Sequence, residues 1–156
     1  MIRSRFVLAS VWLMLVLFLG SAYFSAQETG RFVLPVLKLL MPGVPFAHLH
    51  GVHLVLRKLA HLAEYAVLAL LWFKAVYRAG GRAPRAAAWM ALSICLACAF
   101  TDEVHQSTLS SRQGSARDFV IDAFGATAML TLVRSRQTAG DRRGRLGQAV
   151  AAEPAD

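Results

Sequence analysis

Ionisable side chains lie at the ends of several apolar segments of this 156-residue chain. They are Lys58, His61 and Glu64 at the start of one segment, Asp102 and Glu103 at the end of a second, and Asp118 and Asp122 at the start of a third. A charge close to bilayer hydrocarbon is costly, so such groups are usually paired, face protein or water, and take part in function. These residues are therefore the candidates for chemistry.

Proton transfer or metal ligation could be the task of the acids and the histidine. Asp102 and Glu103 are neighbours in sequence, and paired carboxylates suit a general base or a metal site. His61 could transfer a proton. The predicted catalytic residues are His61, Asp102, Glu103 and Asp122. Structural alternatives remain open, because the carboxylates could end a helix or pair with arginine, and His61 could pack as a neutral residue bonded to Glu64.

Basic residues beside these acids could hold the phosphate of a substrate. Lys58 offers an ammonium group, and Arg112 and Arg117 suit bidentate recognition of phosphate or carboxylate. Alternatively, Lys58 extends to the membrane interface and the arginines form salt bridges with Asp118 or Asp102. The predicted substrate-binding residues are Lys58, Glu64, Tyr65, Gln106, Arg112, Arg117 and Asp118.

A second histidine cluster, His48, His50 and His53, precedes His61 and could suggest zinc. No single regular structure aligns all of these rings, so we assign no metal ligands. The sequence leaves any cofactor unknown.

Four apolar segments are predicted to position these groups as membrane-spanning helices. They cover residues 6–24, 59–77, 86–102 and 117–134. About 20 apolar residues cross a bilayer core as a helix, and helices satisfy their own backbone hydrogen bonds in lipid. We therefore predict an all-α bundle of four transmembrane helices, formed by residues 1–136 and followed by a disordered cytoplasmic tail at 137–156.

Helical periodicity brings the polar groups to common faces. At 100° per residue, an arc of about 120° on the second span holds four polar residues, Lys58, His61, Glu64 and Tyr65. Asp118 and Asp122 are four residues apart and share a face of the fourth span. Three helix ends would then meet at one membrane interface.

The basic residues predict that both termini are cytoplasmic, because cytoplasmic loops carry an excess of Lys and Arg. This orientation places inside the cell Arg3 and Arg5, Lys74, Arg78, Arg82 and Arg85, and the arginines between residues 134 and 145. The segment 32–41 is then a short interfacial stretch on the outer face. The first span could instead be a signal peptide cleaved after Gly20-Ser21-Ala22, but its apolar run continues to Phe24, which favours retention.

Composition also points to a membrane. Hydrophobic residues make up 56% of the chain and charged residues only 17%. Lys and Arg number 17 against 9 acids, but they bracket apolar segments instead of forming a stripe with aromatics, which argues against a nucleic-acid partner. Cys95 and Cys98 lie within an apolar run and are predicted to be packing residues.

The ordered polar motifs resemble the VanZ-like family. They are Lys58-x2-His61-x2-Glu64-Tyr65, Thr101-Asp102-Glu103-x2-Gln106 and Arg112-Gln113-Gly114-Ser115-x-Arg117-Asp118-x3-Asp122-x2-Gly125. Two positions depart from the family pattern. Ser111 stands where a glycine often precedes the loop arginine, and Asp122 stands where members often have Asn, which adds a negative charge that needs a partner.

The resemblance implies a small multi-pass bacterial membrane protein of the cytoplasmic (inner) membrane. The founding member is linked to resistance to the glycopeptide teicoplanin, which targets cell-wall precursors at the outer face. Two functional hypotheses remain open. The chain could act on or bind an envelope lipid or a lipid-linked, phosphate-bearing precursor, with membrane lipids as partners. Alternatively, it is a non-enzymatic binding, transport or assembly module whose charges form a structural ion-pair network.

Overall fold

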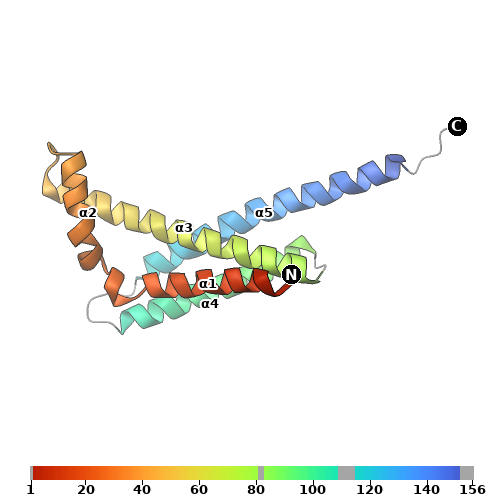
Figure 1. Cartoon of the computed structure of the whole chain (residues 1–156), viewed down its shortest axis with the longest axis horizontal. Helices are drawn as coiled ribbons and strands as arrows, with labels where there is room; N and C mark the ends of the chain where they lie inside the picture. The colour runs from red at the N-terminus through yellow and green to blue at the C-terminus, as the bar shows by residue number, and fades with distance from the viewer. Residues whose placement is uncertain (1, 81–82, 109–114, 152–156) are drawn as a thin grey trace.

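Helices form all of the regular structure in the part of the chain that the computed structural model describes, residues 2–80, 83–108 and 115–151 (Figure 1). The elements are α1 (Ile2–Leu19), the 3-10 turn η1 (Ala22–Phe24), α2 (Ala26–Leu40), α3 (Phe46–Gly80), α4 (Pro84–Ser107) and α5 (Ala116–Ala151). The predicted all-α class is confirmed.

Two of these helices are long and apolar enough to cross a membrane, namely Phe46–Ala79 within α3 and Pro84–Ser107. The uncharged part of α1, Phe6–Leu19, is shorter. Four transmembrane helices with both ends in the cytoplasm therefore stay a prediction.

A core of small and large side chains joins α1, α3, α4 and α5. Tyr65, Leu68 and Phe73 of α3 are almost completely buried, and they pack in one cluster with an alanine- and cysteine-lined face of α4. Small residues allow helix backbones to approach closely. Cys95 and Cys98 are free and buried in this cluster, which confirms that they are packing residues.

The second predicted helix is much longer than expected, because α3 begins at Phe46 and not near residue 59. Pro45 stands directly before the helix, a position that proline tolerates well. Between Phe46 and Leu59 there is no proline, and Gly51 is the residue least favourable to a helix. The stretch before residue 59, which we placed outside the second span, is therefore a helical extension of it.

The predicted interfacial stretch is part of α2, which lies at one end of the bundle and crosses the start of α3 (Figure 1). Ser25 caps this helix, since its Oγ accepts a hydrogen bond from the backbone N–H of Glu28 at 3.3 Å. Phe32, Val36 and Leu39 are well exposed. An exposed apolar face suits a helix that lies against a membrane surface.

The tail also differs from its prediction, because α5 continues as helix to Ala151 and extends beyond the bundle (Figure 1). Tyr77 Oη donates a hydrogen bond to the Asp141 carboxylate at 3.1 Å, and Gln137 Nε2 donates to Tyr77 Oη at 3.2 Å. These contacts join the extension to the end of α3. Composition indicated disorder, but contacts of Tyr77 with Gln137 and Asp141 hold the first part of the tail against α3.

Candidate functional site

A histidine–aspartate pair links α3 to α5. His61 Nδ1 lies 3.4 Å from Asp122 Oδ1, within ion-pair range. The two atoms are not aligned as a hydrogen bond, and both are buried without another partner in the described part of the chain. Asp122 is 1% exposed. The added charge at this position therefore has His61 as its close neighbour.

One turn nearer the end of the bundle, Lys58 Nζ donates to Asp118 Oδ1 at 2.8 Å. The side chain of Lys58 is 48% exposed and that of Asp118 is 26% exposed. An exposed pair of this kind contributes at most about 1 kcal/mol. Lys58 therefore pairs across α3 and α5, which differs from the structural alternative that we gave for it, extension to the membrane interface.

Glu64 lies one turn further along α3 than His61. Its carboxylate is within electrostatic range of His61, Asp122 and Asp102. No hydrogen-bond partner for this carboxylate occurs among the described residues, whereas its backbone carbonyl accepts from Trp12 Nε1 at 3.1 Å. The side chain is thus available to an outside donor.

Asp102 is fixed at the end of α4, where it is 3% exposed. Its Oδ2 accepts a hydrogen bond from Gln106 Nε2 at 2.6 Å. The carboxylate also lies against Gly20, where an added Cβ would overlap it. Gln106 therefore orients the Asp102 carboxylate, and the absence of a side chain at Gly20 leaves room for that carboxylate.

Glu103 joins α4 to the start of α5. Its Oε2 accepts a hydrogen bond from the backbone N–H of Ser115 at 2.5 Å. Ser115 directly precedes α5, so this contact fixes where the helix begins. This contact is structural, but it differs from the two alternatives that we gave for Glu103, the end of its own helix and a pair with arginine. The side chain of Glu103 remains partly exposed.

The other predicted site residues are less closely grouped. Tyr65 is 1% exposed and its hydroxyl donates to Cys98 Sγ at 3.8 Å, so it belongs to the core. Arg117 is exposed and forms no ion pair with another described residue. Arg112, with Gln113, lies outside the described residues.

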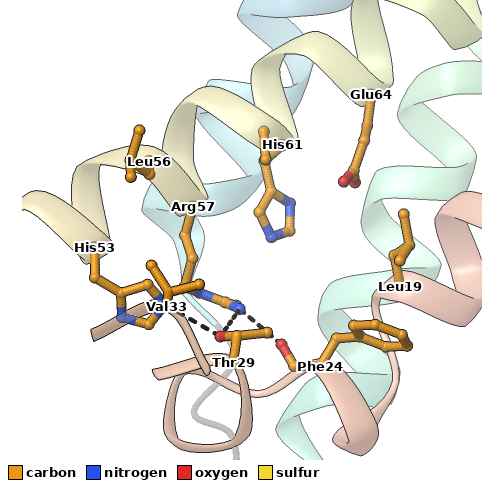
Figure 2. A pocket seen from close by; sticks show the side chains of 10 residues that line it. Leu19, Phe24, Thr29, Val33, His53, Leu56, Arg57, His61 and Glu64 are labelled. Carbon is orange, nitrogen blue, oxygen red and sulfur yellow. Dashed lines mark hydrogen bonds between the residues drawn. The ribbon is translucent and has the colours of Figure 1, made fainter. Parts of the chain in front are cut away.

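A pocket of ≈ 250 Å³ opens beside the His61–Asp122 pair, between the end of α1, η1, α2 and α3. Its lining residues are Leu19, Phe24, Thr29, Val33, His53, Leu56, Arg57, Ala60, His61 and Glu64. In Figure 2, the side chains of His61 and Glu64 point into the same space, towards Leu19 and Phe24. Most of the wall is apolar, with charged groups along the α3 side.

Sequence reasoning missed two residues of this pocket, Arg57 and His53, as site residues. Arg57 Nη1 donates to the carbonyl of Phe24 at 2.7 Å and to Thr29 Oγ1 at 3.4 Å. His53 is 1% exposed, and its Nε2 lies 3.2 Å from Thr29 Oγ1. Because Thr29 donates its own proton to the carbonyl of Ser25, His53 Nε2 must be the donor to Thr29.

A signal for these residues was present in the spacing. Residues 53, 57, 61 and 64 follow one another at intervals of four, four and three, which is one face of a helix. The signal is visible only if the helix begins before His53. Our prediction that the second span begins at residue 59 concealed it.

The described residues contain no group of three or more His, Cys, Asp or Glu that could hold a metal ion. His50 and His53 have ring centroids 6.2 Å apart, but His53 binds Thr29 and His48 is exposed. The arrangement of His61 is more informative. Its Nδ1 faces a buried carboxylate while its side chain lines a pocket, which is how a histidine is oriented for proton transfer.

Comparison with known proteins gives one family. The model of the family described as VanZ/LLP1 matches residues 6–137, which include all of α2, α3 and α4 and most of α1 and α5. No curated protein and no solved structure matches the chain. The match covers the residues that carried the resemblance in the sequence.

Proposed function

This chain belongs to the VanZ/LLP1 family, and from that premise we propose that it binds or acts on an envelope lipid or lipid-linked cell-wall precursor. The family and the two helices of membrane-spanning length together indicate a membrane protein. The site then lies at the outer face of the cytoplasmic membrane of a multi-pass protein. Glycopeptide tolerance is the phenotype that such an activity would affect.

The pocket between α1, η1, α2 and α3 is the observation that carries this proposal. Its apolar wall suits a hydrocarbon chain, and Arg57, His61 and Glu64 suit a polar headgroup. Ligand sites commonly combine an apolar lining with a few convergent polar groups. A lipid-linked molecule has both parts.

The geometry favours different roles for the four residues that we predicted to be catalytic. His61 is on the pocket wall with Asp122 behind it, so this pair is best placed to move a proton. Asp102 and Glu103 make contacts that hold α4 against α1 and α5. They act as positioning residues in this proposal.

Two substitutions test the proposal. His61→Asn should leave accumulation in the membrane unchanged, because the amide still gives the buried Asp122 carboxylate a polar neighbour. It should abolish teicoplanin tolerance, because asparagine at the pocket cannot take up and release a proton. Glu103→Gln should reduce accumulation, because the neutral amide accepts a weaker hydrogen bond from Ser115. Accumulation is measured by immunoblotting of membranes and tolerance by the inhibitory teicoplanin concentration.

The second candidate function is a non-enzymatic module in which the charges are a structural network. The pairs Lys58–Asp118 and His61–Asp122, both joining α3 to α5, favour it. In that case His61→Asn reduces accumulation and tolerance together. Unchanged accumulation and tolerance in both variants would contradict both functions at this site.

A further inference from the structure

Arg57 is a half-buried cation on α3 that lacks a salt bridge in the described part of the chain. Asp118 and Glu64 are within electrostatic range of it, but Asp118 pairs with Lys58. Its hydrogen bonds to Phe24 and Thr29 both use Nη1 and go to neutral oxygens. A charge in such a position usually has an anionic partner.

Glu64 is an acid in the same pocket, two helical turns from Arg57. Its carboxylate has no donor among the described residues. Residues 57 and 64 are two helical turns apart, about 10 Å along α3, with His61 between them. The pocket thus offers an anion-binding group and a donor-binding group along one wall.

The opposite wall is apolar. Leu19, Phe24 and Val33 line it, and they come from α1, η1 and α2, while Leu56 adds an apolar side chain from α3. A hydrocarbon chain packed there would be removed from water, and this transfer is favourable by about 25 cal/mol per Å² of apolar surface buried. The occupant therefore needs an apolar chain next to a charged headgroup.

From this arrangement we propose that the pocket binds a phospholipid-type amphiphile whose headgroup carries an N–H or O–H donor beyond its phosphate. Arg57 binds the phosphate, Glu64 accepts from the donor, and the apolar wall contacts the chain. This assignment rests on the proposed function and narrows its ligand class. Free phosphate, which lacks the chain and the second donor, should bind weakly.

The full chain in neutral detergent allows a direct test by native mass spectrometry. The probes are dioleoyl-phosphatidylethanolamine, dioleoyl-phosphatidylcholine, dioleoylglycerol and inorganic phosphate. The first two share formal charges and a phosphate but differ in N–H donors, so the ethanolamine lipid should bind about tenfold more tightly. Dioleoylglycerol and phosphate should bind more weakly than both lipids.

Variants assign the effect to the pocket. Ala60→Phe fills the pocket without removing a polar contact and should abolish binding. Ala63→Phe, on an exposed part of the same helix outside the pocket lining, is the matched control. Glu64→Gln should reduce the preference for the ethanolamine lipid over the choline lipid. Arg57→Lys should weaken the binding of both phospholipids several-fold, since lysine cannot reproduce the guanidinium fork.

Equal binding of the ethanolamine and choline lipids to the unaltered chain would overturn the proposal, as would equal binding to Ala60→Phe and Ala63→Phe. Teicoplanin tolerance of Ala60→Phe is measured in parallel. Lost tolerance without headgroup preference would refute the ligand class and support the proposed function. Kept tolerance with lost lipid binding would support the ligand class and refute the proposed function.

Discussion

His61 and Asp122 lie close together in the candidate site without forming a hydrogen bond. Their atoms lie 3.4 Å apart without hydrogen-bond alignment, and Asp122 is almost fully buried. A buried carboxylate left without a partner is costly, whereas a pair of neighbouring groups lowers that cost. His61 lines the pocket in this same position.

At the residue scale, Gly20→Ala should destabilise the protein. The new Cβ would overlap the carboxylate of Asp102, which is buried and held by Gln106. Overpacking of this kind costs about 1–3 kcal/mol. The thermal aggregation midpoint in detergent measures the effect.

Gly43→Ala is the matched control, because nothing lies within 4 Å of the Cβ position there. It should leave the midpoint nearly unchanged. Equal midpoints for the two variants would mean that Asp102 is free to move away from α1.

At the scale of elements, α3 is the helix that organises the molecule. It contacts α1, α2, α4 and α5, and it carries Arg57, Lys58, His61 and Glu64 within two turns. Its closest approach to α5 depends on Gly125, where a Cβ would overlap the backbone carbonyl of Leu62. A backbone atom cannot move aside as a side chain does.

Gly125→Ala should therefore separate α3 from α5 and reduce accumulation in the membrane. Alanine favours a helix by about 1 kcal/mol over glycine, so any loss must come from the overlap. Gly140→Ala in the same helix has nothing within 4 Å of its Cβ and should not reduce accumulation. If Gly125→Ala accumulates like Gly140→Ala, the close helix contact is not needed.

At the scale of the whole molecule, the polar side chains of the candidate site lie towards one end of the bundle. That end holds η1, the end of α4 and the start of α5, whereas the end of α3 and the start of α4 lie at the opposite end (Figure 1). If both termini are cytoplasmic, as predicted, this end lies at the outer face of the membrane, and the proposed ligand comes from the outer leaflet.

Reporter fusions test the predicted orientation. With both termini in the cytoplasm, a phosphatase fused after Tyr77 should be inactive and one fused after Gln106 should be active. The reason is that Tyr77 and Gln106 lie near the C-terminal ends of α3 and α4, two successive helices that run in opposite directions (Figure 1). Fluorescence from a green fluorescent protein fused after Gln106 would contradict the predicted topology, because it would place that end of α4 in the cytoplasm.

The sequence by itself determined the helical class, the family and the helix faces on which polar residues are grouped. Hydropathy and periodicity are local properties, so they can be read without knowing what packs against each helix. They predicted that Lys58, His61 and Glu64 share one helix face and that Asp118 and Asp122 share another, because residues three or four apart lie on one face.

Only the tertiary structure decided which of those residues meet. Composition could not show that α3 begins at Phe46 or that α5 continues to Ala151, because contacts such as Tyr77–Asp141 lie far apart in sequence. Nor could it place Arg57 on a pocket wall formed by four separate elements. Pairing and enclosure depend on long-range packing, in which the neighbours of a side chain are chosen by the whole fold and not by its own segment.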